Sequence, residues 1–163
     1  MATVGHLIVG LAVGRAYDRG KVAMGAMSVG AVLPDLDFLL FPGHGILPYA
    51  HRGMTHSLAF AVLAGLAAWA VALVRSADSF RAGLFFALTM ATHGVIDAFS
   101  LSGSGIDLLW PILNVRLLPA HRFIPVASFA SFGVFVVTGF IEVLVFSPFA
   151  LYALWPRREA APR

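Results

Sequence analysis

The chain contains no cysteine and few charged residues. None of its 163 residues is a cysteine and only 12% are charged, whereas about a quarter of the residues in soluble domains are charged. Without cysteine there can be no disulfide, no thiolate metal site and no cysteine nucleophile. Hydrophobic residues make up 60% of the chain, which leaves too little polar surface for a soluble globule of this size. The composition therefore predicts a protein surrounded by lipid.

Long apolar stretches alternate with polar turns along the whole chain. They predict an all-α membrane protein with about five transmembrane helices, at residues 3–17, 22–41, 55–74, 80–99 and 125–155. Thr55 is a candidate N-cap for the third segment. Pro34 and Pro148 are expected to loosen or bend the second and fifth segments. We predict a single integral-membrane domain over residues 1–163, with two long extracytoplasmic loops at 42–56 and 100–123.

The basic residues are distributed unequally between the two ends of these segments. One side receives 8 of them, including Arg15, Arg75 and Arg157, and the other receives 3, namely Arg52, Arg116 and Arg122. The positive-inside rule places the first side in the cytoplasm. We therefore expect a multi-pass protein of the bacterial inner membrane with a cytoplasmic C-terminus. Scattered basic residues favour this topological interpretation over nucleic-acid binding.

Potential metal ligands collect on the opposite, extracytoplasmic side. Threading the chain across the bilayer places all six histidines and several aspartates there. Their imidazole nitrogens and carboxylate oxygens are ligands for divalent metal ions. The set comprises His6, Asp35, Asp37, His44, His51, His56, His93, Asp97, Asp107 and His121.

His93 and Asp97 are the firmest pair in this set. They lie four residues apart in the motif H-G-V-I-D, so a helix places both on one face. Both side chains can then reach one metal ion. The alternative is a hydrogen-bonded polar pair that helps helices associate, but ionisable groups inside membrane segments are costly and usually functional.

Two further motifs predict ligands. Asp35 and Asp37 in P-D-L-D lie near the end of a segment that Pro34 loosens, where a cation would relieve their mutual repulsion. One would bind the metal directly and the other would act as a base or support a ligand; the alternative is a pair of interfacial acids. His51 and His56 flank Arg52 in H-R-G-M-T-H, and Arg52 is a natural partner for phosphate.

The remaining polar residues have weaker signals. His6 lies one turn into the first segment and is either a ligand or a partner in helix packing. His121 is an undecided ligand, whereas His44 and Asp107 are expected to be bystanders. Glu142 is an isolated acid in the fifth segment, interpreted as a residue that packs helices or extends to the membrane surface.

His6 and the three motifs P-D-L-D, H-R-G-M-T-H-S and H-G-V-I-D together resemble the YdjM-like family. These bacterial membrane-bound proteins are predicted metal-dependent hydrolases, also described as LexA-binding inner-membrane proteins. The resemblance covers about the first 100 residues. More distantly, the chain is similar to zinc-dependent phospholipase C, although it lacks an H-x-x-x-E after its H-x-x-x-D. The core ligands that this likeness implies are Asp35 or Asp37, His56, His93 and Asp97. The residues that it implies for a second ion are His6 and His121.

We therefore predict a metal-dependent hydrolase that cleaves a phosphoester of a lipid or polyprenyl phosphate at the extracytoplasmic headgroup level. One or two Zn²⁺ ions, with Mn²⁺ or Fe as alternatives, would activate water. Asp35 or Asp37 would accept the proton, and Arg52 would hold phosphate oxygens. The alternatives are a zinc-dependent lipid amidase or esterase, and a non-enzymatic metal-binding or regulatory membrane protein. No nucleic-acid contact is expected.

Overall fold

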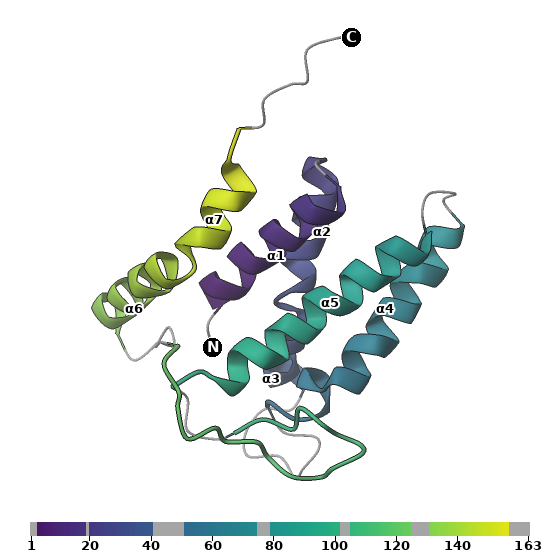
Figure 1. The fold of residues 1–163 in the computed structure, drawn as a ribbon. Coiled ribbons are helices and arrows are strands. Elements are labelled where there is room, and N and C mark those ends of the chain that lie inside the picture. The colour runs from purple at the N-terminus through teal and green to yellow at the C-terminus, as the bar shows by residue number, and fades with distance from the viewer. Residues whose placement is uncertain are drawn as a thin grey trace.

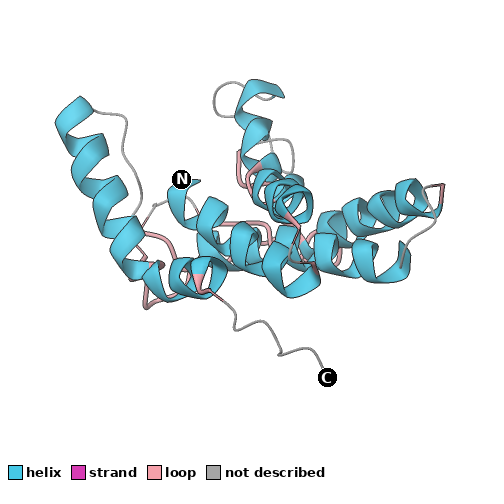
Figure 2. Ribbon diagram, turned by 90° about the horizontal axis from the view of Figure 1, so that it is seen from above, coloured by secondary structure: helices cyan, strands magenta, loops and turns pink. Residues whose placement is uncertain are grey.

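The computed structural model describes residues 3–18, 20–40, 51–74, 79–101, 105–124 and 131–156. The elements in this part of the chain are helices, joined by loops that contain two isolated bridges, Ser100 with Ile124 and Ile106 with Leu117. The predicted all-α class is confirmed (Figures 1 and 2).

The first two helices form a close hairpin. Helix α1 (Thr3–Tyr17) lies against α2 (Lys21–Gly30), and glycines on α1 allow the two backbones to approach closely. A Cβ atom added at Gly10 would lie 2.6 Å from the Cα of Ser28, so only glycine allows this approach. The hydroxyl of Ser28 also donates a hydrogen bond to the carbonyl of Leu7 at 2.9 Å.

The chain bends where Pro34 interrupts the second apolar segment. A short 3₁₀ helix, η1 (Leu33–Leu36), follows α2 and leads into α3 (Asp37–Leu40). The bend between α2 and the 33–39 segment is 46°. This irregular backbone confirms the expected loosening, and it places Asp35 and Asp37 in two different short helical elements.

Helices α4 (Leu58–Leu73) and α5 (Ser79–Ala98) pack side by side (Figure 1). Their backbones approach at two facing glycines, since a Cβ at Gly65 would lie 2.7 Å from the carbonyl oxygen of Gly83. The prediction that Thr55 caps this helix is wrong. Ser57 is the N-cap and accepts a hydrogen bond from the amide of Phe60 at 3.1 Å.

The last segment is divided into α6 (Phe132–Val145) and α7 (Ser147–Leu154), which meet at 65° close to Pro148. Both are drawn at the left of Figure 1, where α7 runs beside α1. The predicted bend is confirmed; the first residues of the predicted segment, 125–130, lie outside the described part.

Among the described residues no single helix is long and apolar enough to cross a bilayer. Two bent pairs meet these requirements of length and composition when each is taken together: α2 with Leu33–Leu39, and α6 with α7. Crossing of a membrane by five segments therefore stays a prediction.

Candidate metal centre

Helix α5 presents the central pair of the site. His93 and Asp97 lie one turn apart near its end, and both are buried. Between them, Gly94 has no side chain where the carbonyl of His56 comes close, and an added Cβ would also lie 3.0 Å from Leu108 Cδ1. The glycine therefore allows the segment before α4 to rest directly on α5.

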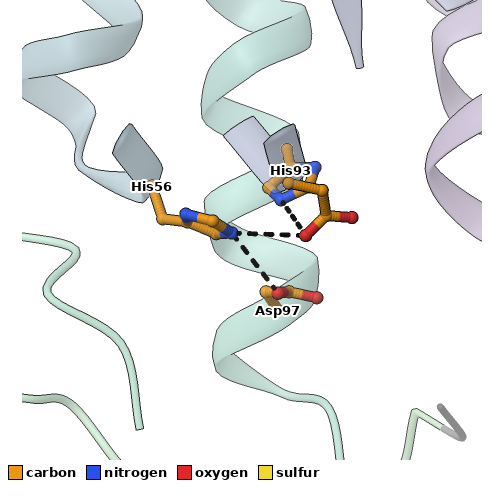
Figure 3. A group of neighbouring side chains, drawn as sticks. His56, His93 and Asp97 are labelled. Carbon is orange, nitrogen blue, oxygen red and sulfur yellow. Dashed lines mark ion pairs between the residues drawn. The ribbon is translucent and has the colours of Figure 1, made fainter. Parts of the chain in front are cut away.

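Four side chains converge at this point. Asp35 from η1, His56 from the short 3₁₀ helix η2 (Met54–His56), His93 and Asp97 each direct one ligand atom to a common region where all four atoms lie within 4.8 Å of one another. Asp35 Oδ1 lies 3.5 Å from Nε2 of His56 and 3.6 Å from Nε2 of His93. Asp97 Oδ2 is 3.8 Å from His56 Nε2 (Figure 3).

Most of the atoms that face one another here are buried and have no hydrogen-bond partner. They are both carboxylate oxygens of Asp35, Nε2 of His56 and Nε2 of His93, whereas Oδ2 of Asp97 forms an ion pair with Arg52. Buried polar atoms in folded proteins are nearly always hydrogen-bonded. Nitrogen and oxygen atoms at these separations can instead share a divalent cation. The donor set therefore fits a divalent metal ion.

In both His56 and His93, the second ring nitrogen, Nδ1, lies close to a polar group outside the cluster of four. His93 Nδ1 lies 2.6 Å from the carbonyl oxygen of Ala31 and donates to it, which leaves Nε2 as the free lone pair. His56 Nδ1 lies 3.0 Å from the hydroxyl of Thr55 and 3.4 Å from Asp37 Oδ2. Metal-binding histidines typically have such a partner, which sets the tautomer and the ring orientation.

Asp37 differs from Asp35 in that its oxygens have partners. Oδ1 is 2.6 Å from Nδ1 of His51, and Oδ2 accepts from the hydroxyl of Thr55 at 2.8 Å and from the amide of Arg52 at 3.2 Å. Asp37, His51 and His56 form a second group of potential ligands. Burial alone would lower the pKa of His56, but the neighbouring carboxylates of Asp35 and Asp37 raise it above its ordinary value.

His6 also reaches the centre, from α1. Its Nε2 lies 3.2 Å from Asp97 Oδ1, and its ring stacks on that of His93 with centroids 3.8 Å apart. It does not belong to the group of four. The structure thus places His6 behind the Asp97 carboxylate, although its Nδ1 is buried and has no hydrogen-bond partner.

Arg52 is buried and points inward. Its guanidinium is 2.9 Å from Asp97 Oδ2 and donates to the hydroxyl of Ser100 at 2.8 Å. Its backbone has a positive φ of 67°, a conformation that is uncommon outside glycine and costs free energy. The structure therefore brings Arg52 to the potential metal ligands, and its binding of phosphate stays a prediction.

A loop holds the segment that contains His51, Arg52 and His56 against the helices. The carbonyl of Arg52 accepts from the amide of Asp107 at 3.1 Å, and that of His51 accepts from the guanidinium of Arg116 at 3.2 Å. Asp107, expected to be a bystander, is fully buried, and burial raises its pKa against the opposing effect of Arg116 at 3.6 Å. It lies outside both groups of potential ligands.

One histidine that was an undecided ligand is not part of this centre. His121 is exposed on the loop after Leu118 and belongs to neither group of ligands. His44 lies outside the described residues. Sequence reasoning did not foresee the hydrogen-bonding roles of Thr55 and Ser100. For Thr55, its position next to a predicted histidine ligand was an available signal.

Comparisons with known proteins agree with one another. The family model described as YdjM inner membrane protein matches residues 1–160. The chain is 31% identical over 132 residues to the inner membrane protein YbcI of Escherichia coli (strain K12), an alignment that covers 76% of this chain and 73% of that protein. No solved structure matches the chain.

Proposed function

The chain belongs to the YdjM inner membrane protein family, and on that premise we propose that it is a metal-dependent hydrolase of the bacterial inner membrane. Its substrate would be a phosphoester of a lipid or polyprenyl phosphate. The observation that supports this best is the buried group of Asp35, His56, His93 and Asp97, in which the facing atoms of the first three residues have no hydrogen-bond partner. The chain also exposes many large apolar side chains, which lipid accommodates better than water does.

In this proposal the four residues hold a single divalent ion, preferably Zn²⁺. When bound, such an ion lowers the pKa of a coordinated water to about 7 and polarises a phosphoryl oxygen. Asp35 contributes a direct ligand because both its oxygens lack partners, whereas Asp37 is fully hydrogen-bonded and orients His56. His6 and Arg52 hold the two oxygens of Asp97.

Asp37 and His51 provide a route for the proton that hydrolysis releases. Asp37 links His56, which is buried, to His51, whose side chain is 30% exposed. Nδ1 of His51 donates to Asp37, which leaves Nε2 of His51 to accept the released proton and return it to solvent. This arrangement assigns the base function to the Asp37 and His51 pair rather than to Asp35.

The surface near the site suits lipid. The loop that covers the His51–His56 segment exposes apolar side chains, with Ile112 86% exposed and Val115 61% exposed. Trp110 lies in the same loop, and indole rings favour the membrane interface. A lipid phosphoester could keep its chain in the bilayer while its headgroup approached His51.

A second candidate function is a metal-binding membrane protein without catalysis. The observation that favours it is burial, because the four ligands and Arg52 each expose 3% or less of their surface. Arg52 is also engaged with Asp97 rather than directed to a substrate. In this case the ion would hold η1, α5 and the His51–His56 segment together.

The test begins with metal analysis of detergent-purified protein. Wild type should contain about one ion per chain, His93→Ala almost none, and the control His121→Ala as much as wild type. A metal content near zero in wild type would refute both candidates. Turnover of phospholipid or polyprenyl phosphate, lost in His93→Ala, would support the hydrolase; turnover of acyl-lipid amides or esters alone would indicate an amidase or esterase. Stoichiometric metal without turnover would favour the second candidate.

A further inference from the structure

Glu142 is a buried acid on a helix that contains none of the predicted ligands. It lies on α6 and is 0% exposed. Its Oε2 accepts hydrogen bonds from the backbone amides of Val4 and Gly5, each at 3.1 Å. The contact joins residues that are more than 130 positions apart in the chain. The interpretation of Glu142 as a residue that extends to the membrane surface is therefore not supported, whereas its interpretation as a helix-packing residue is.

The first turn of α1 suits this carboxylate. The first four amides of an α-helix have no partner within the helix, and the helix dipole makes this end partly positive. A buried carboxylate elsewhere would be costly, but here it meets two amide donors and a favourable field. Glu142 therefore anchors the beginning of α1.

An apolar contact reinforces the anchor. Phe146 lies one turn after Glu142, and its ring packs so close to Gly5 that an added Cβ would lie 2.6 Å from Phe146 Cδ2. Phe146 also packs with Val9 in the buried apolar cluster. The end of α6 thus holds the first turns of α1 by hydrogen bonds and by packing, which limits both sliding and rotation of α1.

His6 follows directly after the two anchored residues. Its Nε2 is 3.2 Å from Asp97 Oδ1, and its ring stacks on His93. We propose that Glu142 is a positioning residue: through the first turn of α1 it sets the place of His6 and so the orientation of the Asp97 carboxylate in the metal group. This inference rests on the proposed metal site for its functional consequence.

Zinc affinity, measured by competition with a chelating dye, tests the chain of contacts. Glu142→Ala should weaken binding about tenfold, as is typical for partners that orient metal ligands. Glu142→Gln should restore most of the affinity because its amide oxygen still accepts hydrogen bonds. Ser131→Ala, which removes the N-cap of α6 without contacting the site, should leave affinity unchanged.

A double-mutant cycle separates positioning from general destabilisation. If Glu142 acts through His6, Glu142→Ala should add little to the loss that His6→Ala causes alone. Additive losses, or a Glu142→Ala protein with wild-type affinity, would overturn the inference while leaving the proposed metal site intact.

Hydrogen exchange of the metal-free protein gives a readout that does not need zinc. Amides 4–9 should exchange faster in Glu142→Ala and at the wild-type rate in Glu142→Gln. Unchanged exchange in Glu142→Ala would overturn the anchoring of α1. If wild type bound no zinc, the proposed function would fall, and with it the role toward Asp97, whereas the exchange data would still decide whether Glu142 holds α1.

Discussion

Asp35 and Asp97 should affect stability in opposite directions, although both bind the proposed metal. Asp97 Oδ2 lies 2.9 Å from the guanidinium of Arg52, and both side chains are buried. Asp35 has no such partner, and both its oxygens are buried without hydrogen bonds. Replacing each aspartate by asparagine removes one charge and keeps the shape. Any difference between the two variants then reports the environment of the charge.

The expected magnitudes follow from these environments. Asp97→Asn leaves the Arg52 charge buried without its partner, which typically costs about 3–5 kcal/mol of the free energy of unfolding. Asp35→Asn in the metal-free protein removes a carboxylate whose unsatisfied burial costs about 1–3 kcal/mol, so the free energy of unfolding should rise by about that amount. A requirement for metal binding would explain why position 35 is an aspartate although asparagine would make the metal-free protein more stable.

Thermal unfolding in detergent with a chelator measures both effects. The comparison is made at about pH 9, above the range in which imidazoles ordinarily titrate. Each kcal/mol should shift the midpoint by about 2–4 °C for a chain of this size. With zinc present, wild type should gain stability and Asp35→Asn should gain almost none. A metal-free Asp35→Asn protein as destabilised as Asp97→Asn would refute the reasoning, because Asp35 would then be a structural residue.

Three further predictions concern pH, packing and topology. Burial would lower the pKa of His56, but Asp35 and Asp37 raise it above its ordinary value of 6.5. Protonated His56 should therefore stabilise the metal-free protein below pH 6.5, and this stability should be lost as the pH rises through the raised pKa. Zinc affinity should increase as His56 loses its proton. Thermal unfolding and dye competition at several pH values check both trends, and a flat profile would contradict them. Gly65→Ala should lower the free energy of unfolding by about 1–3 kcal/mol because its Cβ would meet the backbone of α5 at 2.7 Å, whereas Gly139→Ala, which meets nothing within 4 Å, should not destabilise. A reporter fused to the C-terminus should read as cytoplasmic, and an extracytoplasmic signal would show that the charge bias was misinterpreted.

The order of helices could be predicted because apolar runs and helix-breaking residues are local signals. Helix α1 has the predicted bounds, and Pro34 and Pro148 lie close to the two bends. The start of α4 was misplaced because Thr55 and Ser57 are both good N-caps. Tertiary contacts decided between them, since the Thr55 hydroxyl donates to Asp37 and leaves Ser57 to cap the helix.

The members of the candidate site were visible in the sequence, but their roles were not. Helical spacing brought His93 and Asp97 together, and the structure places them in one group with Asp35 and His56. Asp35 and Asp37 could not be distinguished from spacing, because what separates them is whether other segments supply hydrogen-bond donors. An arginine is a natural partner for phosphate, but the direction of the Arg52 side chain depends on Asp97 of α5, with which it forms an ion pair.

By itself, the sequence determined the helical class, the breaks in the apolar segments and the set of residues able to bind a metal. These properties depend on composition and on neighbours within a turn or two, where side-chain chemistry and backbone preferences act directly. Only the tertiary structure decided which of those atoms remain without partners, that His121 lies apart, and that Glu142 anchors α1. Burial and hydrogen-bond satisfaction arise between segments distant in the chain, and no local pattern encodes them.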